Sequence, residues 1–152
     1  MAETDLILSG QTKTTPPVRV DTEVGPLVLD TEGNLLTKIK PVDGTSFNVT
    51  STASTNLSTR KASPGNLYEL TVSNPTATAA SVKFYNKAAN PTLASDVPLF
   101  TVTLAAGATM PLNFGALGKR FSVGIAMAIT ALPAATDTGN AVAGVQVSGT
   151  YL

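Results

Sequence analysis

The acidic side chains of residues 45–152 are only three, Glu69, Asp96 and Asp137, and they stand in different segments. Two carboxylates about 5–10 Å apart, one of them with a raised pKa, would suit glycoside hydrolysis. Glu69 falls in an alternating run on the side opposite Leu70, so we expect it to face solvent. Asp96 and Asp137 stand in turn-like sequences, where carboxylates typically bond nearby backbone amides. We therefore do not expect the three carboxylates to form a catalytic pair.

The chain of 152 residues contains no cysteine and no histidine. It therefore lacks thiol nucleophiles, disulfides, the commonest metal ligand and the usual general base near neutral pH. Zinc sites of the Cys and His type, and Ser–His–Asp or Cys–His catalysis, are excluded. We expect a protein that is not an enzyme and needs no cofactor.

Calcium is the one metal that the remaining side chains could hold, because loop carboxylates, amides and backbone carbonyls are hard oxygen ligands. Asp137 and Asn140, with Asp96 as a further ligand, form the one cluster worth naming. The run Asp30-Thr31-Glu32-Gly33-Asn34 superficially resembles a calcium loop, but it lacks the downstream bidentate Glu and is better explained as a hairpin turn. The prediction is no resident metal, with a calcium ion near Asp137 left open.

The remaining polar candidates are two basic pairs, Arg60-Lys61 and Lys119-Arg120, and the two tyrosines Tyr68 and Tyr85. Ten basic and ten acidic residues give zero net charge, and no aromatic residues interleave with the pairs, so nucleic acid is not an expected partner. The tyrosines could stack on a sugar, but tyrosine in a strand more often packs across strands.

No segment of the sequence predicts a membrane partner. Residues 1–5 are polar and acidic, without the basic and apolar regions of a secretory signal. The most apolar stretch, residues 121–135, is shorter than the roughly 20 residues that a spanning helix needs, and it contains Pro133.

Charge is distributed unevenly along the chain. Residues 1–43 hold seven acids and four bases, a net charge of −3, whereas residues 44–152 hold three acids and six bases, a net charge of +3. A head-to-tail contact between an acidic N-terminal segment and a neighbour's basic body fits this asymmetry. A scatter of surface charges without function is the better explanation, because three unit charges on a surface are commonplace.

The N-terminal segment, residues 1–44, is predicted to be an extended arm with a β-hairpin. Pro16-Pro17 precludes a central strand, and two apolar runs around Asp30–Asn34 indicate a hairpin, which is marginal in water on its own. We therefore expect the arm to bind a partner through its apolar residues. These candidate partner-binding residues are Leu6, Ile7, Leu8, Val18, Val20, Leu27 and Leu29.

Residues 45–152 consist of short alternating runs separated by turns such as Ser63–Asn66. Three sets of residues are each predicted to share one face of a strand: Tyr68, Leu70 and Val72; Val82 and Phe84; and Phe100, Val102 and Leu104. Seven or eight such strands and no helical stripe predict an all-β protein. We expect an antiparallel β-sandwich, a jelly roll or a related Greek key, whose strand order periodicity does not determine.

The clearest alternation runs from residue 121 to residue 130. Every odd position is large and apolar, and every even position is small. This period of two predicts one strand with a single apolar face. That face would consist of Phe121, Val123, Ile125, Met127 and Ile129.

Several short motifs occur in series over about residues 46–152. They are Asn66-Leu67-Tyr68, Lys83-Phe84-Tyr85-Asn86-Lys87, Asp96-Val97-Pro98, Phe114-Gly115, Phe121, Gly124-Ile125-Ala126, Ala128-Ile129-Thr130 and Asp137-Thr138. The series resembles small structural proteins encoded in the head and tail modules of tailed bacteriophages. The resemblance implies a β-sandwich component of the virion, often oligomeric, docked on a capsid or a tail. None of the motifs is catalytic, and the resemblance transfers no binding site.

The leading functional hypothesis is a capsid decoration (cement) protein, located in the virion after assembly in the bacterial cytoplasm. Its body would sit on the outer shell as a homotrimer, and its arm would reach the major capsid protein or another virion protein. One alternative is a component of the tail, collar, baseplate or fibre attachment. An alternative of another class is a carbohydrate-binding module that recognises the host surface, for which Tyr85 is the candidate stacking residue.

Overall fold

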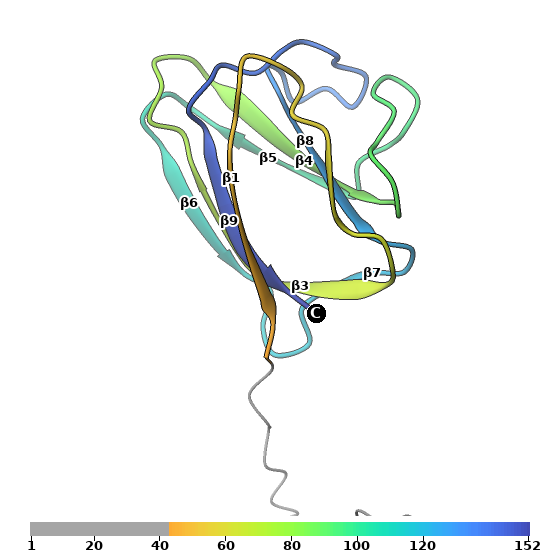
Figure 1. Ribbon diagram of the computed structural model, residues 1–152. Helices are drawn as coiled ribbons and strands as arrows, with labels where there is room; N and C mark the ends of the chain where they lie inside the picture. Colours follow the sequence, from red (N-terminus) through yellow and green to blue (C-terminus); the bar gives the residue numbers. More distant parts are fainter. Residues whose placement is uncertain (1–42) are drawn as a thin grey trace, which may run out of the picture. The chain divides into compact units, whose positions relative to one another are not determined.

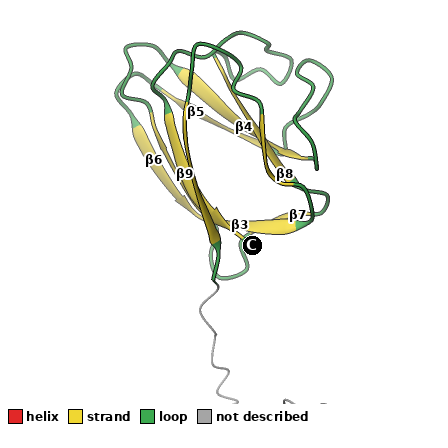
Figure 2. Cartoon of the chain, viewed as in Figure 1, coloured by secondary structure: helices red, strands yellow, loops and turns green. Residues whose placement is uncertain are grey.

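In the computed structural model, a compact unit begins after Lys40, and the structure describes residues 43–152. The described chain contains strands and loops and no helix (Figures 1 and 2). It forms nine strands, one more than the upper expectation of eight. They are β1 (Thr45–Thr50), β2 (Ser58–Lys61), β3 (Gly65–Ser73), β4 (Ala80–Asn86), β5 (Phe100–Leu104), β6 (Thr109–Asn113), β7 (Lys119–Phe121), β8 (Ile125–Thr130) and β9 (Gln146–Tyr151).

The strands form two antiparallel sheets that pack face to face (Figure 1). One sheet has the order β1-β9-β3-β6, with β7 paired to the start of β3, and the other has the order β2-β8-β4-β5. The pairs β1–β9, β2–β8, β3–β6 and β4–β5 are the nested pairs of a jelly roll, to which β7 is an addition. The expected β-sandwich is therefore confirmed, and its strand order is that of the jelly roll.

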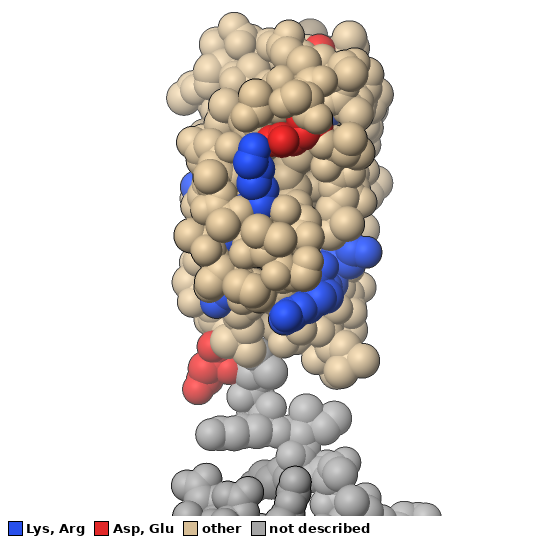
Figure 3. All heavy atoms as spheres, turned by 90° about the vertical axis from the view of Figure 1, so that its right-hand side faces the viewer, with Lys and Arg blue, Asp and Glu red and all other residues tan. Residues whose placement is uncertain are grey.

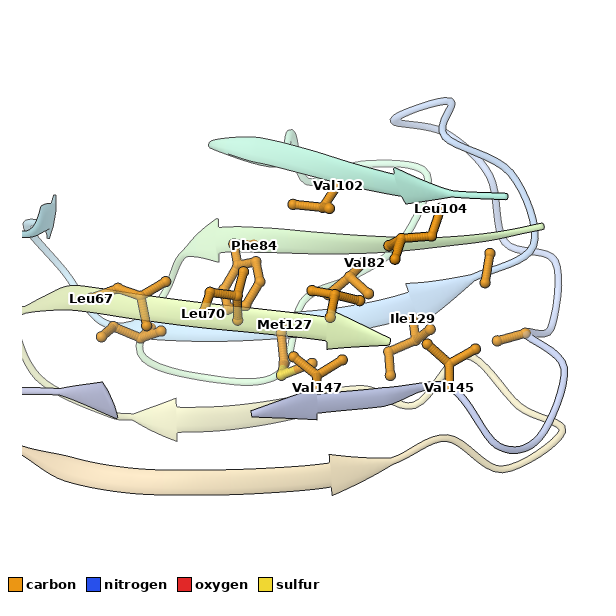
Figure 4. Close-up of a cluster of buried hydrophobic side chains, with 14 of the residues drawn as sticks. Leu67, Leu70, Val82, Phe84, Val102, Leu104, Met127, Ile129, Val145 and Val147 are labelled. Carbon is orange, nitrogen blue, oxygen red and sulfur yellow. The ribbon is translucent and has the colours of Figure 1, made fainter. Parts of the chain in front are cut away.

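The hydrophobic core lies between the two sheets, and Figure 4 shows side chains from both sheets pointing into it. Val82, Phe84, Val102 and Leu104 are buried, and Phe100 is half-buried against them. The rings of Phe84 and Phe100 stack with centroids 4.9 Å apart. The alternation predicted for these two strands, β4 and β5, is therefore correct.

The predicted face of β3 is wrong at one position. Leu70 and Val72 are buried in the core as expected, but the third buried residue is Leu67, whereas Tyr68 is only half-buried. The pairing register between β3 and β9 shifts between Leu67 and Glu69. A β-bulge of this kind adds one residue to one strand, so Leu67 and Leu70 point to the same side although they are three residues apart.

The sequence predicts one strand over residues 121–130, and this prediction is wrong, because the run is divided between two strands. Phe121 ends β7 in one sheet, Ile125 begins β8 in the other, and Val123, in the connection between them, is 48% exposed. The crossing is fixed by Asn86, whose Oδ1 accepts from the Val123 amide at 2.8 Å and whose Nδ2 donates to Ser122 Oγ at 2.8 Å. Phe121, Ile125, Met127 and Ile129 are buried in the core as predicted.

Both faces of β8 are buried, although the sequence predicts only one apolar face. The small residues Ala126 and Ala128 lie with Tyr85 on the outer face of the sheet, where Leu93 packs over them. Small side chains leave room for loops to cover this face, so β8 becomes a central strand shielded on both sides. No helix of residues 43–152 is long and apolar enough to cross a membrane.

Candidate functional site

The loop after β8 is built around the ammonium group of Lys83. This side chain extends from β4 and is buried, and its Nζ donates to the carbonyl oxygens of Ala134 at 2.6 Å and Asp137 at 3.3 Å. Burial lowers the pKa of Lys83, and the charge of Asp137 opposes that shift. The loop carbonyls therefore face a cation supplied by the protein itself.

The carboxylate of Asp137 organises the same loop from the other side. Its Oδ2 accepts from the Leu132 amide at 2.9 Å and its Oδ1 from the Gly139 amide at 3.0 Å. Burial by itself would raise the pKa of Asp137, but these two bonds, a bond from Thr130 and the charge of Lys83 together hold the pKa below its ordinary value. Asp137 bonds nearby backbone, as its turn-like sequence indicates.

The calcium cluster considered from the sequence is not assembled. Within residues 43–152, no group of three or more acidic side chains lies close enough together to hold a metal ion. Both carboxylate oxygens of Asp137 accept from loop amides, and Asp96 is engaged with Lys87 and the Thr92 amide. Asp96, the second carboxylate considered for the calcium site, therefore holds the loop between β4 and β5.

Asp96 and Lys87 form an ion pair that ties together the two ends of the loop between β4 and β5. The hydrogen bond from Lys87 and the bond from the Thr92 amide lower the pKa of Asp96. A cavity of about 300 Å³ lies beside the pair, and Tyr85, Pro98 and Leu99 are among its lining residues. On the face seen in Figure 3, charged side chains are few and most of the surface is uncharged.

Tyr85 is not placed to stack on a sugar, because its side chain is 1% exposed beneath Leu93. Its hydroxyl is buried and has no hydrogen-bond partner among the described residues. Burial, together with the charge of Asp96, raises the pKa of Tyr85. The structure therefore uses Tyr85 to pack the outer face of its sheet. Tyr68, the other candidate, is half-buried.

The two basic pairs lie on strands. Arg60-Lys61 ends β2, and Lys119-Arg120 begins β7. Arg120 pairs with Asn66 across β7 and β3, and Lys61 pairs with Ile125 across β2 and β8. Arg60 lies over the ring of Phe47, 5.9 Å from its centroid, and its carbonyl oxygen accepts from the Tyr151 hydroxyl at 2.7 Å. This contact joins β2 of one sheet to β1 and β9 of the other, so it closes that side of the sandwich.

The opposite side of the sandwich is open. A groove of about 490 Å³ lies between β5, the outermost strand of one sheet, and β6, the outermost strand of the other. Its lining is mostly apolar. The residues used below are Phe100, Val102, Met110, Leu112, Phe114 and Lys119. Sequence reasoning missed this groove, although Pro111 in the middle of β6 was a sign of an edge strand.

The candidate partner-binding residues of the N-terminal arm, and the hairpin expected around residues 30–34, lie outside the described residues. Residues 43–152 contain three separate features of interest: the loop held by Lys83 and Asp137, the loop held by Lys87 and Asp96, and the apolar groove. No family model, no curated protein and no solved structure matches this chain.

Proposed function

We propose that this protein is a structural component of a bacteriophage virion, and specifically a capsid decoration protein that stabilises the head by binding its outer surface. The proposal joins the resemblance of residues 46–152 to phage structural proteins with the jelly-roll order of the body, an architecture that also serves viral capsid proteins. Fold-level likeness is an analogy and leaves the function to be argued from particular surfaces.

The observation that carries the proposal is the pairing of a well-packed body with a long preceding segment rich in short apolar runs. Residues 43–152 bury 18 hydrophobic residues between and outside their sheets, so they have a core of their own. The 42 residues before them include Leu6-Ile7-Leu8 and Val18-Arg19-Val20. In the proposed function, these runs bind the major capsid protein or a neighbouring virion protein by adding strands to its sheet edges.

In this proposal the body forms a homotrimer that lies on the outer surface of the shell. A protein that binds the assembled shell and not its free subunits stabilises the shell by mass action. Such a role needs shape and apolar contact area and no reacting group. It fits a protein whose buried Lys83 and half-buried Asp137 are used to fix a loop.

The test is binding of the purified protein to undecorated heads. Deleting residues 1–25 should leave a folded body that no longer sediments with the particles, and replacing Leu6, Ile7 and Leu8 by Asp should have the same effect. The matched control replaces Thr12, Thr14 and Thr15 by Asp, which adds the same charge to the polar part of the segment and should leave binding intact. Unchanged occupancy of the shell by the deleted protein would refute the role of the arm.

Copy number decides between the head and the tail. A shell protein is present in hundreds of copies per virion, whereas a collar, baseplate or fibre-attachment component is present in few. Quantitative mass spectrometry of purified virions, with the major capsid protein as internal standard, measures this number. A low copy number would move the protein to the tail.

A further inference from the structure

We propose that the groove between β5 and β6 is the docking site for Leu27-Val28-Leu29 of a second copy of this chain. The inference rests on the self-association included in the proposed function, and it names the two surfaces that meet. The segment adds a strand to the free edge of β5, and two of its side chains fill the groove.

The groove is apolar and incompletely covered by the body itself. Phe100, Leu112 and Phe114 are half-buried against the core, and Met110 is 41% exposed. The other side of the sandwich is closed by the contact of Arg60 with Phe47 and Tyr151. Covering the open side with apolar side chains would remove this surface from water, which favours association.

The two strands that border the groove differ in their ability to accept a further strand. Pro111 interrupts β6 and has no N–H to donate, which is a common protection of an edge strand. β5 has the sequence FTVTL, with no proline and no charged residue. An added strand is therefore expected to pair with β5 and to lie over the side chains of β6.

The alternation of Leu27-Val28-Leu29 matches that of β5. Phe100, Thr101 and Val102 all line the groove, and the alternation of the strand places the Thr101 side chain on the face opposite those of Phe100 and Val102. Directly opposed residues in a sheet point to the same side. A pairing of Leu29 with Phe100 and of Leu27 with Val102 thus places both leucines in the groove and Val28 beside Thr101. In this docked state the hairpin expected around residues 30–34 is open.

Charge sets the direction of this strand. Phe100 lies 5.7 Å from Phe114 and 6.4 Å from Phe121, measured between ring centroids, so the Phe100 end of β5 is the end near β7 and Lys119. Antiparallel pairing brings Leu29 to this end. Asp30 and Glu32, which follow it in the sequence, then approach Lys119, which lines the groove.

The length of chain between the two surfaces suits an adjacent copy. Thirteen residues, 30–42, separate Leu29 from Asp43, the first described residue. Fully extended at about 3.3–3.6 Å per residue, they span about 45 Å, which is more than the width of a domain of this size. The linker is therefore long enough for Leu27–Leu29 to reach a neighbouring body, and the proposal leaves Leu6–Leu8 to bind the shell.

The decisive test uses the absence of cysteine from the natural chain. Full-length Val28→Cys protein is mixed with full-length Thr101→Cys protein of different mass, without particles, and oxidised. A disulfide between unlike chains, in excess over like pairs, is the expected result. No disulfide between unlike chains would overturn the proposal. A doubly substituted chain that forms only an internal disulfide would overturn it too, because the segment would then occupy its own body's groove.

Substitutions test the same contact without cross-linking. Leu27→Asp with Leu29→Asp should raise the dissociation constant of self-association about tenfold or more, which is about 1.4 kcal/mol. The matched control, Val28→Asp, changes the residue that points out of the groove and should leave the constant within about twofold. Equal effects of the two changes, or no effect of either, would contradict the proposed register.

The groove is tested from the body with Met110→Glu, a change at a partly exposed position that the fold should accept. Self-association should weaken as for the leucine variants, whereas Val97→Glu, at a side chain 79% exposed outside the groove, should have no effect. Unchanged self-association of Met110→Glu would place the contact elsewhere.

The outcome is separable from that of the proposed function. Deleting residues 1–25 leaves Leu27–Leu29 in the chain, so self-association should persist while shell binding is lost. If the leucine variants associate normally, the docking proposal fails even where shell binding is observed. If self-association depends on these leucines but the wild-type chain does not bind heads, the proposed function fails and the docking site stands.

Discussion

The side chain of Lys83 donates a hydrogen bond to the main chain of Asp137. The Nζ of Lys83 lies 3.3 Å from the carbonyl oxygen of Asp137, while the Asp137 carboxylate accepts from the amides of Leu132 and Gly139. The ammonium group and the carboxylate thus hold one loop from opposite sides. This loop covers the outer face of β4 and β8 at the place where Lys83 leaves the sheet.

Replacing Lys83 by Met should destabilise the protein although the side chain remains long and apolar. The change removes the two hydrogen bonds from the charged Nζ, to the carbonyl oxygens of Ala134 and Asp137, and a hydrogen bond that involves a charged group contributes about 1.5–3 kcal/mol. The free energy of unfolding in urea measures this loss. Lys119→Met, at a groove-lining lysine, is the control and should change it by less than about 0.5 kcal/mol. Equal values for the wild type and Lys83→Met would show that the bonds contribute no net stability.

Stability should also rise with pH where Lys83 titrates. Its pKa in the folded protein is lowered from 10.5 by burial, so between that lowered value and 10.5 the unfolded chain binds more protons than the folded one. The free energy of unfolding therefore increases with pH across this interval. Denaturation series at pH 8 to 10.5 should show this slope in the wild type, and Lys83→Met should reduce it. A slope unaffected by the substitution would mean that another group titrates.

At acidic pH the free energy of unfolding should also rise with pH, but here the cause is hydrogen bonding to two carboxylates. Hydrogen bonds lower the pKa of Asp96 and, against the effect of burial, the pKa of Asp137, both from 3.8. Their contribution is complete above pH 3.8 and is lost as pH falls through the lowered folded values. Asp137→Asn should flatten the decline in stability below pH 3.8. Parallel declines for the wild type and Asp137→Asn would contradict this account.

The alternation of apolar residues predicted the fold class, because the alternation within a strand depends only on residues that are close together in the sequence. Val82 with Phe84, and Phe100 with Val102 and Leu104, occupy the core as expected. The strand order was not predictable, since β1 pairs with β9, at the far end of the chain. Alternation also fails where the backbone departs from regular pairing, as it does at the bulge beside Tyr68.

The candidate sites were less predictable than the fold. The turn-like sequence around Asp137 correctly indicated bonds to nearby backbone, but nothing in the sequence indicated that Lys83 would donate to the same loop. The groove arises because strands β5 and β6, adjacent in the chain, end up as the edges of two different sheets. Such a site is a product of topology, and no local pattern of residues encodes it.

Gly124 is the position at which the chain changes sheets, and any side chain there should be costly. A Cβ at this residue would lie 2.7 Å from the Lys61 carbonyl oxygen and 2.8 Å from both the Ala88 Cα and the Lys87 carbonyl oxygen, all of them backbone atoms. Gly124→Ala should therefore lower the free energy of unfolding by about 1–3 kcal/mol. Thermal and urea denaturation measure the change. Gly107→Asn is the control, because nothing lies within 4 Å of a Cβ there and Asn tolerates its φ of +72°. A neutral Gly124→Ala would mean that β2 and the start of the β4–β5 loop yield.

The hydroxyl of Tyr85 should be dispensable, whereas its ring should not. The oxygen is buried without a partner among the described residues, and the ring packs against Ala126, Ala128 and Leu93. Tyr85→Phe removes an unsatisfied polar group and should be neutral or stabilising by about 1 kcal/mol, whereas Tyr85→Ala removes the ring and should cost about 3–5 kcal/mol. Urea midpoints of the three proteins test the order Phe, Tyr, Ala. Because the ring supports the sheet, a loss of any binding activity in Tyr85→Ala would report on folding unless Tyr85→Phe lost it as well. A Tyr85→Phe protein clearly less stable than the wild type would show that the hydroxyl does have a bonding partner.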